Sequence, residues 1–215
     1  MSRNFLNKFN KAAAIIFLAG VLNAGCIGAI REKREAARIE QDAAYRNGLG
    51  IYRVGDFYDA NGKQGVVFQI DSTGRHGKIL SLREKKCQWD VNMRIVFPNY
   101  YGTATGATSE ENGLDNWNKV TKIDGWREKY PAFAYCETFG EGWYLPAYYE
   151  WSRIYNLHSR RRALIDSTLN ARQADPLFSG KYWTSSESSG GTAWDSGGST
   201  QPKNAFKQVR AIAAF

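Results

Sequence analysis

The pattern of apolar and polar positions divides the chain into three segments. An unbroken apolar run over residues 12–22 follows three basic residues near the N-terminus, and the chain stays uncharged as far as residue 30. Residues 31–46 are mostly charged residues and alanine, and short alternating patterns with turns begin after them. We therefore expect a signal peptide or membrane-anchor helix over residues 1–30, a charged spacer over 31–46 and one domain over 47–215.

The N-terminal apolar segment allows three processing outcomes. Signal peptidase could cut after the small residues that precede Cys26. Residues 22–26 (LNAGC) also resemble a bacterial lipobox, in which Cys26 would carry the lipid, although Asn23 stands where a branched apolar residue is preferred. Without cleavage, residues 12–30 would be a spanning helix near the minimum length. Each outcome predicts export to the cell envelope, in the periplasm or at the outer membrane.

The spacer has the composition of a solvated helix. Residues 31–46 (REKREAARIEQDAAYR) are rich in helix formers and pair opposite charges four apart, as Arg31 does with Glu35. Apart from alanines, Ile39 is the only apolar position that we count in the segment. The segment therefore lacks the repeat of apolar residues that a coiled coil needs. We expect a helix that lifts the domain away from a membrane.

The domain pattern predicts strands at both ends and helices between them. Strands are expected at 52–59, 65–71, 77–82, 181–186, 192–195 and 206–215, and helices at 114–123, 126–139, 147–157 and 161–171. Residues 102–113 are rich in Gly, Thr and Ser and predict a loop. Because the strands come first and last, the two ends of the domain can pair in one sheet, which makes the fold class α+β.

The charge distribution argues against a nucleic-acid partner. The chain carries a net charge of +8, but residues 1–46 alone hold eight basic and four acidic residues, which is half of that excess. In the export region positive charge sets topology. The longest basic cluster of the domain, Arg160–Arg162, has the pattern of a solvated helix face.

Several motifs of the domain together resemble one family. They are Gly65–Phe68, Gly74–Leu82, Trp126 with Tyr130–Phe133, Gly140–Pro146 (GEGWYLP), Tyr182–Glu187 (YWTSSE), Ala193–Trp194 and Val209–Ala211 (VRA). In this order they resemble the bacterial envelope family catalogued as domain of unknown function 1566, which is related to the Fibrobacter major paralogous domain and abundant in gut Bacteroidetes. The resemblance covers about residues 50–215.

The resemblance implies a C-type-lectin-like fold and a non-catalytic, adhesin-like binding module of the cell surface. Similar C-terminal segments occur in the variable target proteins of diversity-generating retroelements, where residues around the second Trp form a ligand-facing surface. Here the stretches 188–192 and 195–200 are rich in Gly and Ser rather than Asn and Tyr. The implied partner is a glycan, a peptide or a surface protein.

The stretch between Trp183 and Trp194 is the candidate ligand-binding segment. It is polar and short-chained, and binding residues are often found on such loops of a rigid scaffold. Hydroxyls beside a carboxylate can hydrogen-bond a sugar or a peptide, while a solvated hairpin loop remains the alternative. The candidate ligand-binding residues are Ser185, Ser186, Glu187, Ser188, Trp194, Asp195 and Ser196.

The three cysteines suggest one lipid site and one pair. If Cys26 is lipidated, Cys87 and Cys136 remain, and a disulfide between them is the economical expectation in an oxidising compartment. Two free buried cysteines are the alternative, because a sequence separation cannot test disulfide geometry.

Motifs for a metal, a cofactor or catalysis are not evident in the sequence. The Glu-Pro-Asn signature of calcium-dependent lectins is missing around Glu187, Asp195 and Asn204, and neither His76 nor His158 has a partner at metal-ligand spacing. No GxSxG or phosphate loop occurs. We expect no cofactor.

Two alternative functions stay open. One is an envelope enzyme or accessory related to formylglycine-generating proteins, and the other is a fibre subunit that uses Val209–Phe215 as an open strand.

Overall fold

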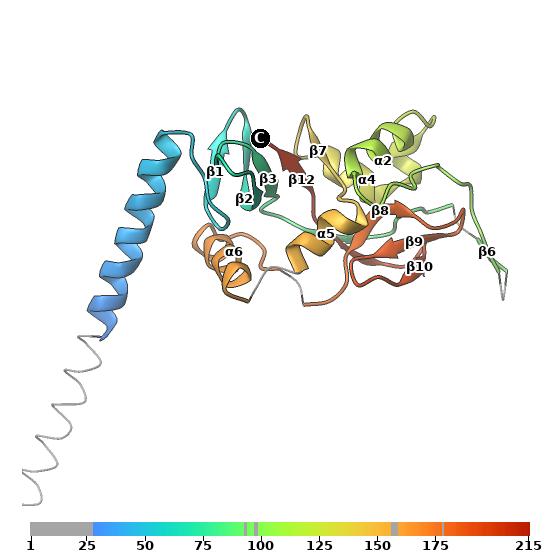
Figure 1. Ribbon diagram of the computed structural model, residues 1–215. Coiled ribbons are helices and arrows are strands. Elements are labelled where there is room, and N and C mark those ends of the chain that lie inside the picture. The colour runs from blue at the N-terminus through green and yellow to red at the C-terminus, as the bar shows by residue number, and fades with distance from the viewer. Residues whose placement is uncertain (1–27, 93, 97–98, 156–158, 178) are drawn as a thin grey trace, which may run out of the picture. The chain divides into compact units, whose positions relative to one another are not determined.

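The computed structural model describes residues 28–215 except 93, 97–98, 156–158 and 178 (Figure 1). The chain forms two compact units, residues 1–49 and 50–215. The described part of the first unit is a helix over residues 28–48 with mostly exposed side chains, as the spacer pattern predicted. The expected signal or anchor over residues 1–30, including Cys26, lies outside the described residues except for its last three positions. Among the described residues, no helix has the length and apolarity needed to cross a bilayer.

The second unit is built on a five-stranded antiparallel sheet. Its strands, in spatial order, are β1 (Phe57–Ala60), β2 (Lys63–Ile70), β3 (Gly77–Leu80), β12 (Ile212–Ala214) and β7 (Trp143–Tyr144). Asn61 and Gly62, both with positive φ, make the two-residue turn between β1 and β2. The expected pairing of the chain's two ends is confirmed, because β12 lies between β3 and β7.

Three smaller sheets hold the remaining described strands. They are β10 (Thr200–Pro202), β9 (Thr192–Asp195) and β8 (Trp183–Glu187) in that order; β11 (Lys207–Val209) with β4 (Lys85–Cys87); and β5 (Arg94–Val96) with β6 (Asn99–Tyr101). The strand expected over 206–215 is therefore two strands in different sheets. The chain passes from one sheet to the other at Arg210 and Ala211. There the Ala211 N–H donates to the Ser81 hydroxyl at 3.2 Å and not to a backbone carbonyl of a neighbouring strand.

Five helices of the domain are described, and their ends follow local signals. They are α2 (Gly113–Val120), α3 (Trp126–Lys129), α4 (Pro131–Glu137), α5 (Tyr148–Tyr155) and α6 (Ser159–Ala171). Asn112 caps α2 by accepting the Leu114 N–H at 3.0 Å. The single helix expected over 126–139 is split at Tyr130, because Pro131 begins α4 at a position where its missing N–H costs nothing.

The main sheet separates two hydrophobic clusters. Successive residues of a strand point to opposite faces, so Val66 and Val67 of β2 belong to different clusters. The Val67 cluster includes Phe133 and Cys136 of α4, together with Trp183. The Val66 cluster packs against α5 and α6 (Figure 1). The mixed α+β class is thereby confirmed, with helices covering both faces of the sheet.

Candidate functional site

Five of the seven candidate ligand-binding residues are buried inside the domain. Ser185 and Ser186 are fully buried, and Glu187, Asp195 and Ser196 are between 1% and 6% exposed. Only Ser188 is exposed and Trp194 half-buried. The structure thus places these five candidate side chains inside the domain, and their internal contacts give the reason.

The buried serines of β8 connect the strand to the segments packed on it. Asn116 donates its amide to the Ser185 hydroxyl at 2.9 Å. The Ser186 hydroxyl accepts the Tyr148 N–H at 3.0 Å and donates to the Ser109 carbonyl at 2.8 Å. Ser186 thus satisfies an N–H at the start of α5 that has no partner within the helix. These hydroxyls serve as internal hydrogen-bonding groups.

The Glu187 carboxylate is held by four donors of the domain. It accepts the N–H groups of Thr105 and Gly106 at 3.0 and 2.9 Å and the Thr105 hydroxyl at 3.1 Å. Its fourth partner is the ammonium of Lys203, which is itself fully buried. The lysine also donates to the Gly190 carbonyl at 2.9 Å and lies 4.3 Å from the centroid of the Trp89 ring. Burial lowers the Lys203 pKa, against the opposing influence of Glu187.

Asp195 and Ser196 shape the loop after β9. The Asp195 carboxylate accepts the N–H groups of Gly197 and Ser199 at 2.9 and 3.1 Å, which is the hydrogen-bonding of an Asx turn. Its other oxygen pairs with Lys207 at 3.2 Å. The Ser196 hydroxyl accepts the Tyr182 N–H at 2.9 Å. Both side chains therefore order the loop that follows Trp194.

An accessible cluster of aromatic side chains lies beside that loop. Tyr148, Tyr149 and Trp194 form what we call the aromatic face: the Tyr148 ring is 5.0 Å from Tyr149 and 5.9 Å from Trp194, centroid to centroid. Tyr149 is 41% exposed, and Tyr148 and Trp194 are half-buried. Adjacent aromatic rings with polar tips are typical of binding surfaces.

A glycine fits the loop closely against the aromatic face. Gly198 has a φ of 79°, which favours glycine. A Cβ built on Gly198 would lie 2.9 Å from the Tyr148 hydroxyl, so a larger residue would displace that ring. Gly198 thus leaves the space that the Tyr148 hydroxyl occupies.

The Trp-Tyr-Leu-Pro motif supports the start of α5. The Tyr144 hydroxyl donates to the buried carboxylate of Glu150 at 2.9 Å. Glu150 also accepts the N–H groups of Ala147 and Gly113, at 2.8 and 3.0 Å, and pairs with Lys78. A glutamate at the third helical position that binds the N–H of the capping residue is half of a capping box. The motif is therefore a structural anchor for the helix that presents Tyr148 and Tyr149.

The expected disulfide is not formed in the structure. Cys87 and Cys136 are both buried free thiols, which is the alternative that the sequence left open. Burial raises the pKa of Cys87 to about 11 and raises that of Cys136 as well, with a smaller contribution from the neighbouring Cys87. A thiol with a raised pKa carries little thiolate at neutral pH, so neither is activated as a nucleophile.

The residues considered for a metal do not converge. Among the described residues, no group of three or more His, Cys, Asp and Glu side chains could hold an ion. His76 is exposed, and His158 lies outside the described residues. The side chains of Glu187 and Asp195 are instead bonded within the domain, each to a lysine.

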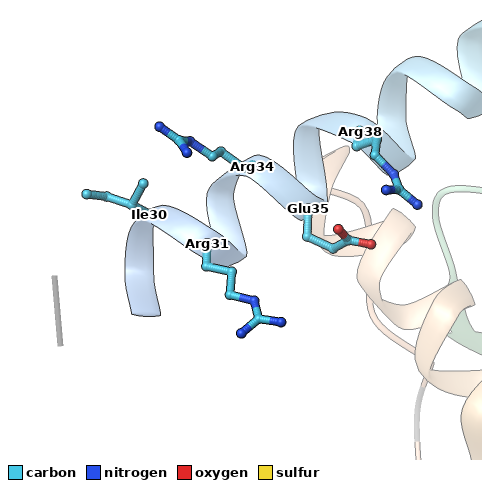
Figure 2. Close-up of a pocket in the computed structure, with 5 residues that line it drawn as sticks. All are labelled: Ile30, Arg31, Arg34, Glu35 and Arg38. Atoms are coloured by element: carbon cyan, nitrogen blue, oxygen red, sulfur yellow. The ribbon is translucent and has the colours of Figure 1, made fainter. Parts of the chain in front are cut away.

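A second group of accessible side chains lies on the helix of the first unit. Figure 2 shows Ile30, Arg31, Arg34, Glu35 and Arg38, which line a shallow recess on that helix. All five are exposed. The arginines point in different directions (Figure 2). The recess is the surface of a solvated helix, as the charged pattern of this segment predicted.

Comparison with known proteins gives no assignment. No family model matches the chain, and no curated protein matches it.

Proposed function

We propose that the chain is an exported, membrane-tethered protein of a bacterial envelope whose domain is a non-catalytic, adhesin-like binding module. The observation that carries the proposal is the aromatic face, where three neighbouring rings remain accessible on a scaffold that fixes them. Glu150 and Ser186 hold the start of α5, and Asp195 orders the loop after β9. Such preorganisation lowers the entropy lost on binding.

A C-type-lectin-like fold is part of the same proposal. The pairing of the N- and C-terminal strands in one sheet supports it, as do the small sheet β10-β9-β8 and the long irregular segment after β6. The resemblance of the GEGWYLP, YWTSSE and VRA motifs to the envelope family supports it independently.

The two alternative functions draw less support from the described residues. The fibre alternative required an open C-terminal strand, but β12 has a neighbour on both sides. The enzyme alternative required a reactive Cys136 or Glu187 in a polar pocket. Cys136 lies in an apolar cluster and Glu187 is paired with Lys203, so neither side chain is available to a substrate.

Array screening of the full chain in detergent tests the proposed function. The proposal predicts selective binding to a set of glycans or peptides. Absence of binding on both arrays, together with turnover of an envelope substrate, would overturn it. The arrays also decide which of the two ligand classes the aromatic face takes.

A further inference from the structure

The buried pair formed by Lys203 and Glu187 has the geometry of a reactive pair. The side chains are 0% and 2% exposed, and the lysine Nζ contacts Oε1 of the carboxylate. The backbone of Lys203 is fixed on both sides, because its N–H bonds the Gly191 carbonyl at 3.0 Å and its carbonyl accepts the Trp89 N–H at 2.8 Å. Amine and carboxyl are therefore held together where bulk water is excluded.

The other carboxyl oxygen of Glu187 lies in a cradle of donors. Oε2 accepts the N–H groups of Thr105 and Gly106 at 3.0 and 2.9 Å, and the Thr105 hydroxyl at 3.1 Å. Fixed N–H donors of this kind stabilise the negative charge that develops on an acyl oxygen when a nucleophile attacks its carbon. The donors would thus stabilise a tetrahedral intermediate at the Glu187 carboxyl carbon.

A further buried carboxyl group belongs to a residue whose backbone bonds that of Lys203. Asp90 is 2% exposed, and its N–H bonds the Lys203 carbonyl at 3.0 Å. Burial raises the pKa of Asp90 and lowers that of Lys203. The raised pKa favours a protonated Asp90, and the lowered pKa favours the neutral amine form of Lys203 that a condensation needs.

We propose that Lys203 and Glu187 condense in the folded protein to an intramolecular isopeptide bond. Proton transfer within the ion pair gives a neutral amine and a neutral carboxylic acid. Nζ attacks the carboxyl carbon of Glu187, and Oε2 takes up the negative charge. A proton passes from the attacking nitrogen to Oε1, which leaves as water. The products are one amide and one water molecule, and no oxidant or co-reactant is needed.

The bond would close a loop that contains the aromatic face's tryptophan. Glu187 and Lys203 are 16 positions apart, and Trp194 lies between them. The cross-link would join the end of β8 to the segment after β10, so it would hold the β8-β9-β10 sheet together under load. A module that binds at a cell surface would gain mechanical strength from such a bond.

The chain contains a matched pair that should not react. Lys78 also pairs with a fully buried carboxylate, that of Glu150, which likewise accepts two backbone N–H groups. The Lys78 side chain is 23% exposed, however, so water reaches it, whereas the Lys203 side chain is fully buried. We therefore expect the cross-link at Lys203 and none at Lys78.

Peptide mapping of the full chain tests the proposal without any variant. Trypsin cuts after Lys181, Lys203 and Lys207, but not after a lysine whose Nζ is an amide. The proposal predicts a peptide Tyr182–Lys207 whose measured mass is one water molecule below the mass calculated from its sequence. Because the cross-link closes a loop, a backbone break between Glu187 and Lys203 should release no fragment ion. In the Lys203→Arg variant, which cannot form the amide, the chain should be cut at residue 203. Complete tryptic cleavage of the parent protein after Lys203 would overturn the proposal. A loss of one water molecule between Lys78 and Glu150, in place of Lys203 and Glu187, would also overturn it.

Discussion

The Arg210 guanidinium and the Glu84 carboxylate form a buried ion pair with an Nη2–Oε2 distance of 2.7 Å. Arg210 is fully buried, and its remaining N–H groups donate to the carbonyls of Ser81, Asp175 and Pro176. Glu84 also accepts the Tyr182 hydroxyl at 2.7 Å. The arginine of the Val-Arg-Ala motif thus joins β3, the segment after α6 and the start of β8.

This arrangement predicts a large stability loss for Arg210→Met. The substitution removes the guanidinium donors of a carboxylate and three carbonyls, which we expect to lower the free energy of unfolding by about 3 to 5 kcal/mol. The exposed pair of Arg83 with Asp175 provides the control, because its side chains are 60% and 36% exposed. Arg83→Met should cost less than about 1 kcal/mol in the same urea titration. Equal losses for the two variants would refute the structural role of Arg210.

The serines of β8 and its following loop are predicted to behave differently. Ser186→Ala removes the acceptor of the Tyr148 N–H and the donor to Ser109, so we expect a loss of about 1 to 3 kcal/mol in unfolding free energy. Ser188→Ala changes an exposed hydroxyl that bonds only Thr192 among the described residues, and it should stay within about 0.5 kcal/mol of the parent. Thermal or urea denaturation checks both values. If Ser188→Ala proved the more damaging substitution, the assignment of Ser186 as a buried support would be wrong.

Gly198 is predicted to matter through its contact with Tyr148. Gly198→Ala places a Cβ at positive φ and 2.9 Å from the Tyr148 hydroxyl, so it should both strain the backbone and move the ring. Gly140 has a φ of 103° with no atom within 4 Å of an added Cβ, so Gly140→Ala adds only the backbone strain, about 1 to 2 kcal/mol. Ligand binding, measured with an array hit, should fall for Gly198→Ala and persist for Gly140→Ala. Unchanged binding in both would show that the position of Tyr148 is unimportant.

The buried thiol of Cys87 predicts a loss of stability at alkaline pH. Its pKa is raised from 9.0 to about 11 in the folded domain. A raised folded-state pKa contributes stability that is fully present below the unfolded value of 9.0 and is lost as pH rises through about 11. We expect the free energy of unfolding to fall across this window, by up to about 3 kcal/mol from this group. The fall should be smaller in Cys87→Ala, and an identical pH profile for both proteins would contradict the prediction.

The sequence predicted the elements whose signals are local. Asn61-Gly62 marks the β1–β2 turn, and the apolar spacing around Trp151 marks the helix α5. Pro131, by contrast, lies within a segment that was expected as one helix. Strands β4 and β10 were missed because they are short and carry no alternating apolar pattern. Their positions depend on partners far along the chain, which a local pattern cannot reveal.

The candidate site was predicted only in part for the same reason. A run of serines with a glutamate looks like a solvated loop, but β8 is covered on both faces, and every residue of it is buried. Only tertiary contacts with Asn116, Thr105 and Lys203 show this. Tyr148 belongs to the helix expected over 147–157, and its half-buried ring lies beside Trp194, which the helical pattern alone does not show.

Binding by the Trp194→Ala variant tests the central claim most directly. Trp194 is half-buried at the aromatic face. Phe206, which is 62% exposed and is not one of the three rings of that face, provides the matched control. With a ligand identified on the arrays, titration calorimetry of the full chain should show at least a tenfold loss of affinity for Trp194→Ala, about 1.4 kcal/mol or more. Phe206→Ala should bind as the parent does. Full affinity in a correctly folded Trp194→Ala protein would contradict the account.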